Sequence, residues 1–218
     1  MNVAKTKILG SNYIGLFGIT NDNLCFLPER VEERAKKIIA ETLDVKVETT
    51  NLYSSELLSV FAKMNNKYCI LPNFADSKEI EKIEKEIKVK IIKTEQAIGN
   101  LIELNDTGAL ISKTAQKNIL EELKKEKLRV HQMNIAKTDA IGSAILTTNK
   151  AFVVSPNATK EEIEQIKNTL QINGGASTAN TRDSLIRNSL LANTKGFVAG
   201  ENTTGFELNR IDQALEQK

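Results

Sequence analysis

Two cysteines and one histidine are the residues of this chain best suited to nucleophilic chemistry. A cysteine nucleophile needs a base such as histidine within hydrogen-bond reach, and spacing alone does not place His131 near Cys25 or Cys69. Both cysteines fall in one column of the internal repeat described below. Other copies fill that column with Ala109, Phe152 and Phe197. A position shared by Cys, Ala and Phe is typical of a protein interior, so we expect two buried thiols that take no part in chemistry.

Other side chains that could support catalysis or ligand binding lack the context that such chemistry needs. Neighbouring acids such as Glu161 and Glu162 lie in charged helical stretches, where solvent rather than mutual burial surrounds them. Gly174 and Gly175 are not followed by the lysine of a phosphate-binding loop. The number and spacing of the cysteines support neither a zinc site nor a disulfide framework. We therefore predict no catalytic residue, no cofactor and no metal.

The strongest pattern in the chain is an internal repeat of five copies. One apolar column recurs at steps of 44, 40, 43 and 45 residues, and each copy continues with a polar triplet flanked by apolar runs. A short polar turn between two apolar runs predicts a β-hairpin, and a period of this length is typical of propellers and solenoids. The column residues are Ile14, Leu58, Ile98, Ile141 and Ile186, and the triplets are residues 21–23, 65–67, 105–107, 148–150 and 193–195.

Each hairpin is followed by a predicted helix and then by a predicted third strand. The helices show apolar residues at helical spacing, as at Ile163, Ile166 and Leu170 of the fourth copy. Capping boxes are expected where an N-cap residue precedes glutamate by three positions, at Asp76, Thr159 and Thr204. The third strands are expected in residues 44–51, 89–95, 129–136 and, more weakly, 174–179.

The fifth copy lacks a third strand, but an extra strand stands at the start of the chain. In residues 2–9, Val3 precedes Gly15 by the same interval that separates Val47 from Ser59. A chain that begins with the strand its last copy lacks can close into a ring and so remove exposed sheet edges. We predict a closed α/β toroid of five strand–strand–helix–strand copies around a pseudo-fivefold axis.

The uninterrupted repeat predicts a single domain over residues 1–218. No segment approaches the ~18 consecutive apolar residues of a membrane helix, and the N-terminus lacks the apolar core of a signal peptide. We therefore expect a cytoplasmic protein that does not contact membranes. The copies span residues 10–53, 54–93, 94–137, 138–180 and 181–218, the last completed by residues 2–9.

Charge limits the kind of partner. The chain has 30 basic and 28 acidic residues, a net charge of +2, and its lysines alternate with glutamates along the helical stretches. A protein that grips RNA mainly through phosphates needs a patch of positive charge, and binders of single strands need aromatic platforms. Neither feature is visible in the sequence, so we expect any contact with nucleic acid to lie next to a contact with a protein.

Taken together, these features resemble a known family. Five hairpin-and-helix copies that close on themselves resemble the pentein toroid. The strings AIGN at 97–100, IGS at 141–143 and GENTTGFEL at 200–208 resemble archaeal translation initiation factor 6. The resemblance covers the whole chain, although Ser59 and Arg187 stand where other copies have glycine. It implies a non-enzymatic factor of protein biosynthesis and ribosome biogenesis that occupies the large (50S) ribosomal subunit and sterically prevents its association with the small (30S) subunit.

The resemblance also implies partners and a binding face. A monomer would contact a ribosomal protein near the sarcin-ricin loop, with ribosomal RNA adjacent and no small-molecule substrate. The residue after the glycine column is expected to begin the first strand of each hairpin and to face outward at the ribosome-facing end. Gly15, Gly99 and Gly142 themselves are expected to allow close backbone approach near the axis. The candidate ribosome-binding residues are therefore Leu16, Val60, Asn100, Ser143 and Asn188, with Asn100 as the first choice.

An enzymatic alternative uses the same toroid. Guanidine-modifying enzymes such as arginine deiminases and amidinotransferases resemble it in fold and use a cysteine, a histidine and two acids around the central cavity. Fold alone does not separate a scaffold from an enzyme. Those enzymes place their cysteine late in the chain, whereas no cysteine follows Cys69 here. A hydrogen bond between His131 and a cysteine across the central cavity would favour this alternative.

Overall fold

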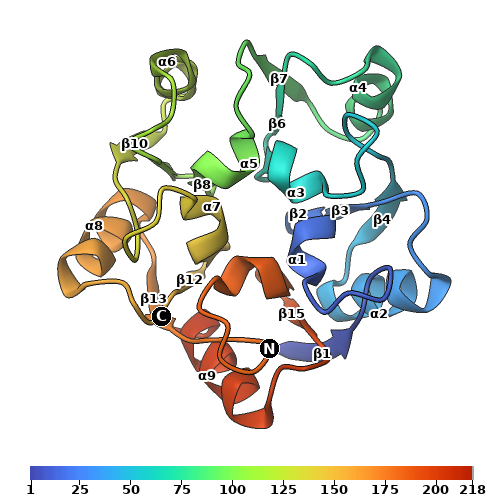
Figure 1. The fold of residues 1–218 in the computed structure, drawn as a ribbon, viewed down its shortest axis with the longest axis vertical. Coiled ribbons are helices and arrows are strands. Elements are labelled where there is room, and N and C mark those ends of the chain that lie inside the picture. The colour runs from blue at the N-terminus through green and yellow to red at the C-terminus, as the bar shows by residue number, and fades with distance from the viewer. Residues whose placement is uncertain (218) are drawn as a thin grey trace.

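A computed structural model describes residues 1–217 and arranges them as a ring of five units around a central axis (Figure 1). Each unit contains a three-stranded sheet, so the predicted pentein-like α/β toroid is confirmed. In chain order the sheets are β2 (Ile19–Thr20), β3 (Leu24–Leu27) and β4 (Lys46–Thr49); β5 (Lys63–Met64), β6 (Cys69–Pro72) and β7 (Val89–Ile92); β8 (Ile102–Leu104), β9 (Gly108–Ile111) and β10 (Arg129–Gln132); β11 (Ile145–Thr147), β12 (Ala151–Val154) and β13 (Asn173–Ala176); and β14 (Leu190–Ala192), β15 (Gly196–Gly200) and β1 (Asn2–Thr6).

The strands pair in the same way in every sheet. The first two form an antiparallel hairpin, and the third returns parallel to the middle strand, so that Cys25 pairs with Thr20 on one side and Val47 on the other. In the fifth sheet the third strand is β1, which runs parallel to β15 with Val3 opposite Phe197. The N-terminal strand thus completes the last sheet, as predicted from the missing strand of the fifth copy.

The predicted helices lie at the outer rim of the ring (Figure 1). Capping boxes begin three of them, at Asp76, Thr159 and Thr204, as expected from the sequence. None of the helices in residues 1–217 has the length and apolar character needed to span a lipid bilayer. The rim helices are α2 (Glu33–Leu43), α4 (Ser77–Glu84), α6 (Lys117–Lys125), α8 (Lys160–Leu170) and α9 (Gly205–Leu215).

The hydrophobic core is divided among the joints between units. In one such cluster Ile39 of α2 and Leu27 of β3 pack with Leu191 and Val198 of the fifth sheet. A rim helix therefore fills the wedge between its own sheet and the preceding one. Because the apolar face of each helix is buried against two sheets, loss of one unit would expose apolar surface on its neighbours.

The two cysteines are interior, as predicted. Cys25 and Cys69 have no exposed surface and lie in two different core clusters. Burial raises the pKa of each thiol to about 12, so neither forms the reactive thiolate near neutral pH.

One element differs from the sequence-based prediction. A single helical turn precedes each hairpin, in residues where the start of the first strand is expected from the sequence. Periodicity cannot separate a strand from a helical turn in a four-residue apolar run. The units converge at the axis, where the first strand is only two or three residues long, and the turn lets the chain change direction before it. The turns are α1 (Ile14–Phe17), α3 (Leu58–Phe61), α5 (Ile98–Leu101), α7 (Ile141–Ala144) and the 3₁₀ turn η1 (Ile186–Ser189).

The glycine column allows these turns to pack directly against one another. A Cβ atom on Gly99 would lie 1.8 Å from the carbonyl oxygen of Ser59, and one on Gly142 would lie 2.0 Å from that of Gly99. Real Cβ atoms do not approach oxygen so closely, so the expected close backbone approach is confirmed. Where the pattern departs from glycine, Ser59 donates its hydroxyl to the carbonyl oxygen of Leu16 at 3.1 Å, and Arg187 extends into the centre of the ring.

Candidate functional site

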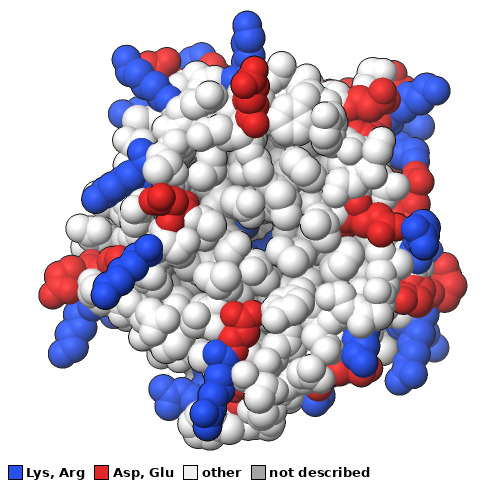
Figure 2. All heavy atoms as spheres, in the orientation of Figure 1, with Lys and Arg blue, Asp and Glu red and all other residues white. Residues whose placement is uncertain are grey.

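The single-turn elements form a face with few charged side chains at its centre. We call this surface the single-turn face; it consists of α1, α3, α5, α7 and η1 with the residue before each. In the space-filling view of this side, lysines, arginines and acids lie mainly toward the periphery (Figure 2). A contiguous surface of this kind is typical of a contact with another macromolecule. The residues before the turns are Tyr13, Leu57, Ala97, Ala140 and Leu185.

All five predicted binding residues belong to this face. They occupy the third position of α1, α3, α5, α7 and η1, instead of the start of a strand as predicted. Ser143 is only 7 % exposed and offers a partner little surface, whereas the other four residues are half-buried. The side chains of Asn100 and Asn188 form no hydrogen bond with any residue of 1–217. Their amides are therefore free to bond to a partner.

The face is not uniform around the ring. In the first two units aromatic residues belong to the face or adjoin it: Phe61 of α3 lies beside the exposed ring of Tyr53, at a centroid distance of 6.1 Å, and Tyr53 contacts Phe74 at 5.1 Å. The other three units contribute Asn100, Asn188, several small residues and the exposed Leu185. Tyr53 and Phe74 were not predicted as binding residues because they lie outside the repeat columns. The sequence signal that could have found them is that the chain has few aromatic residues, and these two lie in loops.

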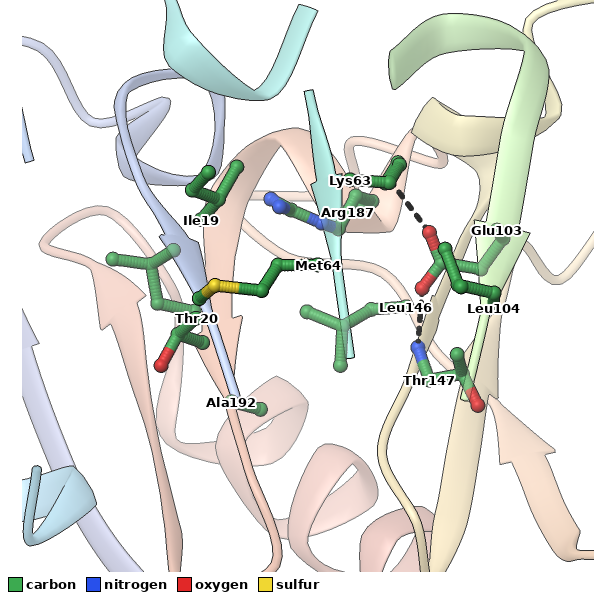
Figure 3. A pocket seen from close by; sticks show the side chains of 11 residues that line it. Ile19, Thr20, Lys63, Met64, Glu103, Leu104, Leu146, Thr147, Arg187 and Ala192 are labelled. Atoms are coloured by element: carbon green, nitrogen blue, oxygen red, sulfur yellow. Dashed lines mark hydrogen bonds and ion pairs between the residues drawn. The ribbon is translucent and has the colours of Figure 1, made fainter. Parts of the chain in front are cut away.

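A charged cluster lies on the axis of the ring, which we call the hub: Lys63, Glu103, Arg187 and the small cavity that they line (Figure 3). Lys63 Nζ lies 2.6 Å from one carboxylate oxygen of Glu103, and the other oxygen accepts the backbone N–H of Thr147 at 2.8 Å. The three charged side chains are 4–7 % exposed. Sequence reasoning missed this cluster, although Lys63 and Glu103 interrupt apolar strands and could have been noticed for that reason.

Arg187 is held differently from Lys63. Its guanidinium donates to the carbonyl oxygens of Gly15 at 2.5 Å, Gly18 at 3.2 Å and Leu190 at 3.3 Å. All three acceptors are uncharged. Burial lowers the pKa of Lys63, the charge and hydrogen bond of Glu103 raise it, and the charge of Arg187 lowers it, so that the net pKa is about 8. The hub thus holds two cations and one anion whenever Lys63 is protonated.

The polar triplets meet at the other end of the innermost strands and form a hydrogen-bonded ring, which we call the turn belt. At four of the five joints a middle residue donates its backbone N–H to the middle side chain of the adjacent unit, as Asn66 does to Asp106 and Thr194 does to Asp22. At the fifth joint Lys150 Nζ donates to the carbonyl oxygen of Thr194. The triplets therefore join the units in addition to closing the hairpins. The middle residues are Asp22, Asn66, Asp106, Asn149 and Thr194.

Replacing Asp22 by asparagine is expected to weaken the turn belt. Burial raises the pKa of the Asp22 carboxyl, but hydrogen bonds from Asn66, Thr194 and Asn149 outweigh it, so the net pKa lies below its usual value. One carbonyl oxygen cannot replace two carboxylate oxygens, so we expect Asp22→Asn to lower the free energy of unfolding at pH 7 by about 1–2 kcal/mol. Urea unfolding measures this loss, with the exposed Asn23→Ala as control.

The same substitution has a pH signature. A carboxyl with a lowered folded-state pKa stabilises the fold above its unfolded pKa, and this contribution is lost as pH falls through the folded pKa. The stability difference between wild type and Asp22→Asn should therefore be constant above the usual carboxyl pKa of 3.8 and shrink below it. Curves that stay parallel throughout acid unfolding would contradict this assignment.

The structure does not assemble the site of the enzymatic alternative. His131 lies in β10, the outer strand of its sheet, and neither cysteine lines the hub. Within the part of the chain that the structure describes, no cluster of three or more His, Cys, Asp or Glu side chains is placed to hold a metal ion. The only carboxylate that lines the hub in this region, Glu103, is engaged by Lys63.

Comparisons with known proteins agree with the resemblance drawn from the sequence. The sequence profile of the eIF-6 family matches residues 3–214. A protein named translation initiation factor 6 from Pyrococcus horikoshii is 32% identical over 224 residues, covering 99% of each chain. Its counterparts from Picrophilus torridus and Methanosarcina mazei are each 30% identical, covering 98% of this chain and 99% and 98% of theirs. With a fivefold α/β toroid and a family match over nearly its whole length, this chain belongs to the eIF-6 family.

Proposed function

We propose that this protein is a translation initiation factor that binds the large (50S) ribosomal subunit and prevents its association with the small (30S) subunit by occupying the joining surface. The names of the relatives support the role in initiation. The observation that carries the binding mode is the single-turn face, whose polar side chains Asn100 and Asn188 have no bonding partner within residues 1–217. Such a factor acts in the cytoplasm as a monomer and needs no small-molecule substrate.

The partner of this face is a ribosomal protein near the sarcin-ricin loop, with ribosomal RNA adjacent. The centre of the face carries few cations, and a contact made mainly to phosphates would need several (Figure 2). The aromatic cluster of Tyr53, Phe61 and Phe74 suits an apolar protein surface, because large aromatic side chains dominate the energetics of protein interfaces. Lysines at the periphery of the ring can meet the neighbouring RNA.

Steric blocking requires rigidity rather than chemistry. The turn belt and the shared core clusters join every unit to its neighbours. A face held in this way loses little conformational freedom on binding, so more of the contact energy contributes to affinity.

Sedimentation with purified large subunits tests the proposal. The protein should co-sediment with large subunits, and small subunits added afterwards should fail to join them. Absence of co-sedimentation, or normal joining in the presence of the bound factor, would refute the proposed function.

The substitution Asn100→Arg tests the face itself. A long charged side chain in the third position of α5 should clash with a closely packed partner and leave buried charge uncompensated, so we expect binding to large subunits to weaken at least tenfold. Asn23→Arg, which adds the same charge to an exposed residue of a turn-belt triplet at the other end of the innermost strands, is the matched control. Equal binding by both variants would show that the single-turn face is not the interface.

A further inference from the structure

The hub contains more positive charge than its own groups neutralise. Lys63 and Glu103 form a close ion pair, but Arg187 bonds only to the carbonyl oxygens of Gly15, Gly18 and Leu190. In Figure 3 the guanidinium points toward Ile19, away from the Lys63–Glu103 pair. A charge removed from water is costly unless an opposite charge accompanies it. The net positive charge of the hub is therefore unusual for a protein interior.

The hub also has space for a small guest. Its cavity has a water-accessible volume of about 30 Å³, lined by Thr20, Met64 and Leu146 besides the charged residues. This is room for roughly two water molecules. A halide ion is only slightly larger than water, whereas sulfate, phosphate and organic anions exceed the cavity.

The cavity communicates with solvent on one side. At the centre of the single-turn face there is an opening, and a basic side chain is visible at its bottom (Figure 2). Lys63 and Arg187 are the basic residues that line the hub among those described. Toward the other end of the axis, Asp22 and Asp106 carry negative charge, but hydrogen bonds from Asn66, Thr194 and Asn149 hold their carboxylates within the turn belt. An anion entering from the single-turn face would meet the cations first.

We propose that the hub binds one small monovalent anion of the size of chloride, held by the charges of Arg187 and Lys63. The anion neutralises the charge of Arg187, which remains after Lys63 and Glu103 neutralise each other. It also stabilises the closed ring, because Arg187 of the fifth unit and Lys63 of the second unit line the same cavity. Anion binding in the hub does not depend on binding to the ribosomal subunit, so either proposal can fail without affecting the other.

Thermal unfolding of the wild-type protein in different salts provides the first test. At constant ionic strength, chloride or bromide should raise Tm in a saturable way relative to gluconate, which is too large for the cavity. A rise of about 3–5 °C is expected at ten times the dissociation constant. Crystals soaked in bromide should show an anomalous peak inside the hub.

Two variants separate net charge from the individual residues. Arg187→Gln leaves a neutral Lys63–Glu103 pair and should abolish the halide effect on Tm. The double variant Lys63→Met/Glu103→Gln removes the pair as a whole, leaves Arg187 as the only charge, and should retain the halide effect. The bromide experiment on wild-type protein decides the matter if Arg187→Gln fails to fold. The proposal is overturned by the lack of a bromide peak in the hub, by equal Tm values in bromide and gluconate, or by a halide effect that survives Arg187→Gln.

Discussion

Replacing Gly99 by alanine is expected to lower the free energy of unfolding by about 3 kcal/mol or more. The added methyl group would lie 1.8 Å from the carbonyl oxygen of Ser59 and 2.8 Å from the carbonyl carbon of Val60. Both are backbone atoms, so no rotation of a side chain can relieve the clash. Instead α5 must move away from α3, which opens the joint between the second and third units.

Urea unfolding monitored by circular dichroism measures this loss. Gly205→Ala is the matched control, because Gly205 has no atom within 4 Å of an added Cβ and begins a helix. The control should match wild type or gain slightly in stability, since alanine restricts the unfolded chain. If Gly99→Ala unfolds within about 0.5 kcal/mol of the control, the single-turn elements do not pack as closely as the structure indicates.

Breaking the hub ion pair from one side should be at least as damaging. Lys63→Met leaves the buried Glu103 carboxylate without the cation that contacts it, because the guanidinium of Arg187 points away and bonds to backbone carbonyl oxygens (Figure 3). Loss of one partner of a buried ion pair typically costs about 3–5 kcal/mol. The double variant Lys63→Met/Glu103→Gln removes both charges at once, and the amide oxygen that replaces the carboxylate could still accept the N–H of Thr147. We therefore expect the double variant to recover most of the lost stability. Urea unfolding of both variants at pH 7 gives the comparison, and equal losses would contradict a direct pair in the hub.

The same pair predicts a pH dependence in the alkaline range. Burial holds the pKa of Lys63 at about 8 in the folded protein, below its usual value of 10.5. Between these two values the unfolded chain binds more protons at Lys63 than the folded protein does, so this group makes stability rise with pH. Wild type should therefore gain stability relative to the double variant between pH 8 and 10.5. A constant difference across that interval would show that Lys63 titrates normally.

The hairpins and rim helices could be predicted from the sequence because they depend on short-range patterns. The hairpin triplets, the apolar faces of the rim helices and the capping boxes at Asp76, Thr159 and Thr204 depend on residues two to four positions apart. Ring closure was also predictable, because the repeat showed which strand the last copy lacked and where the chain held a spare one. For the same reason the candidate face could be named from a single column of the repeat.

Other features were decided by contacts that no local pattern records. Arg187 bonds to Gly15, which is 172 positions away in the chain, and Lys63 pairs with Glu103 of another unit. The turn belt likewise links the polar triplets of different units. Side chains that meet only after the ring closes leave no periodic signal, because their partners are set by the geometry around the axis. The sequence alone therefore determined the units and their order, whereas the tertiary structure decided what fills the centre and which residues the single-turn face exposes.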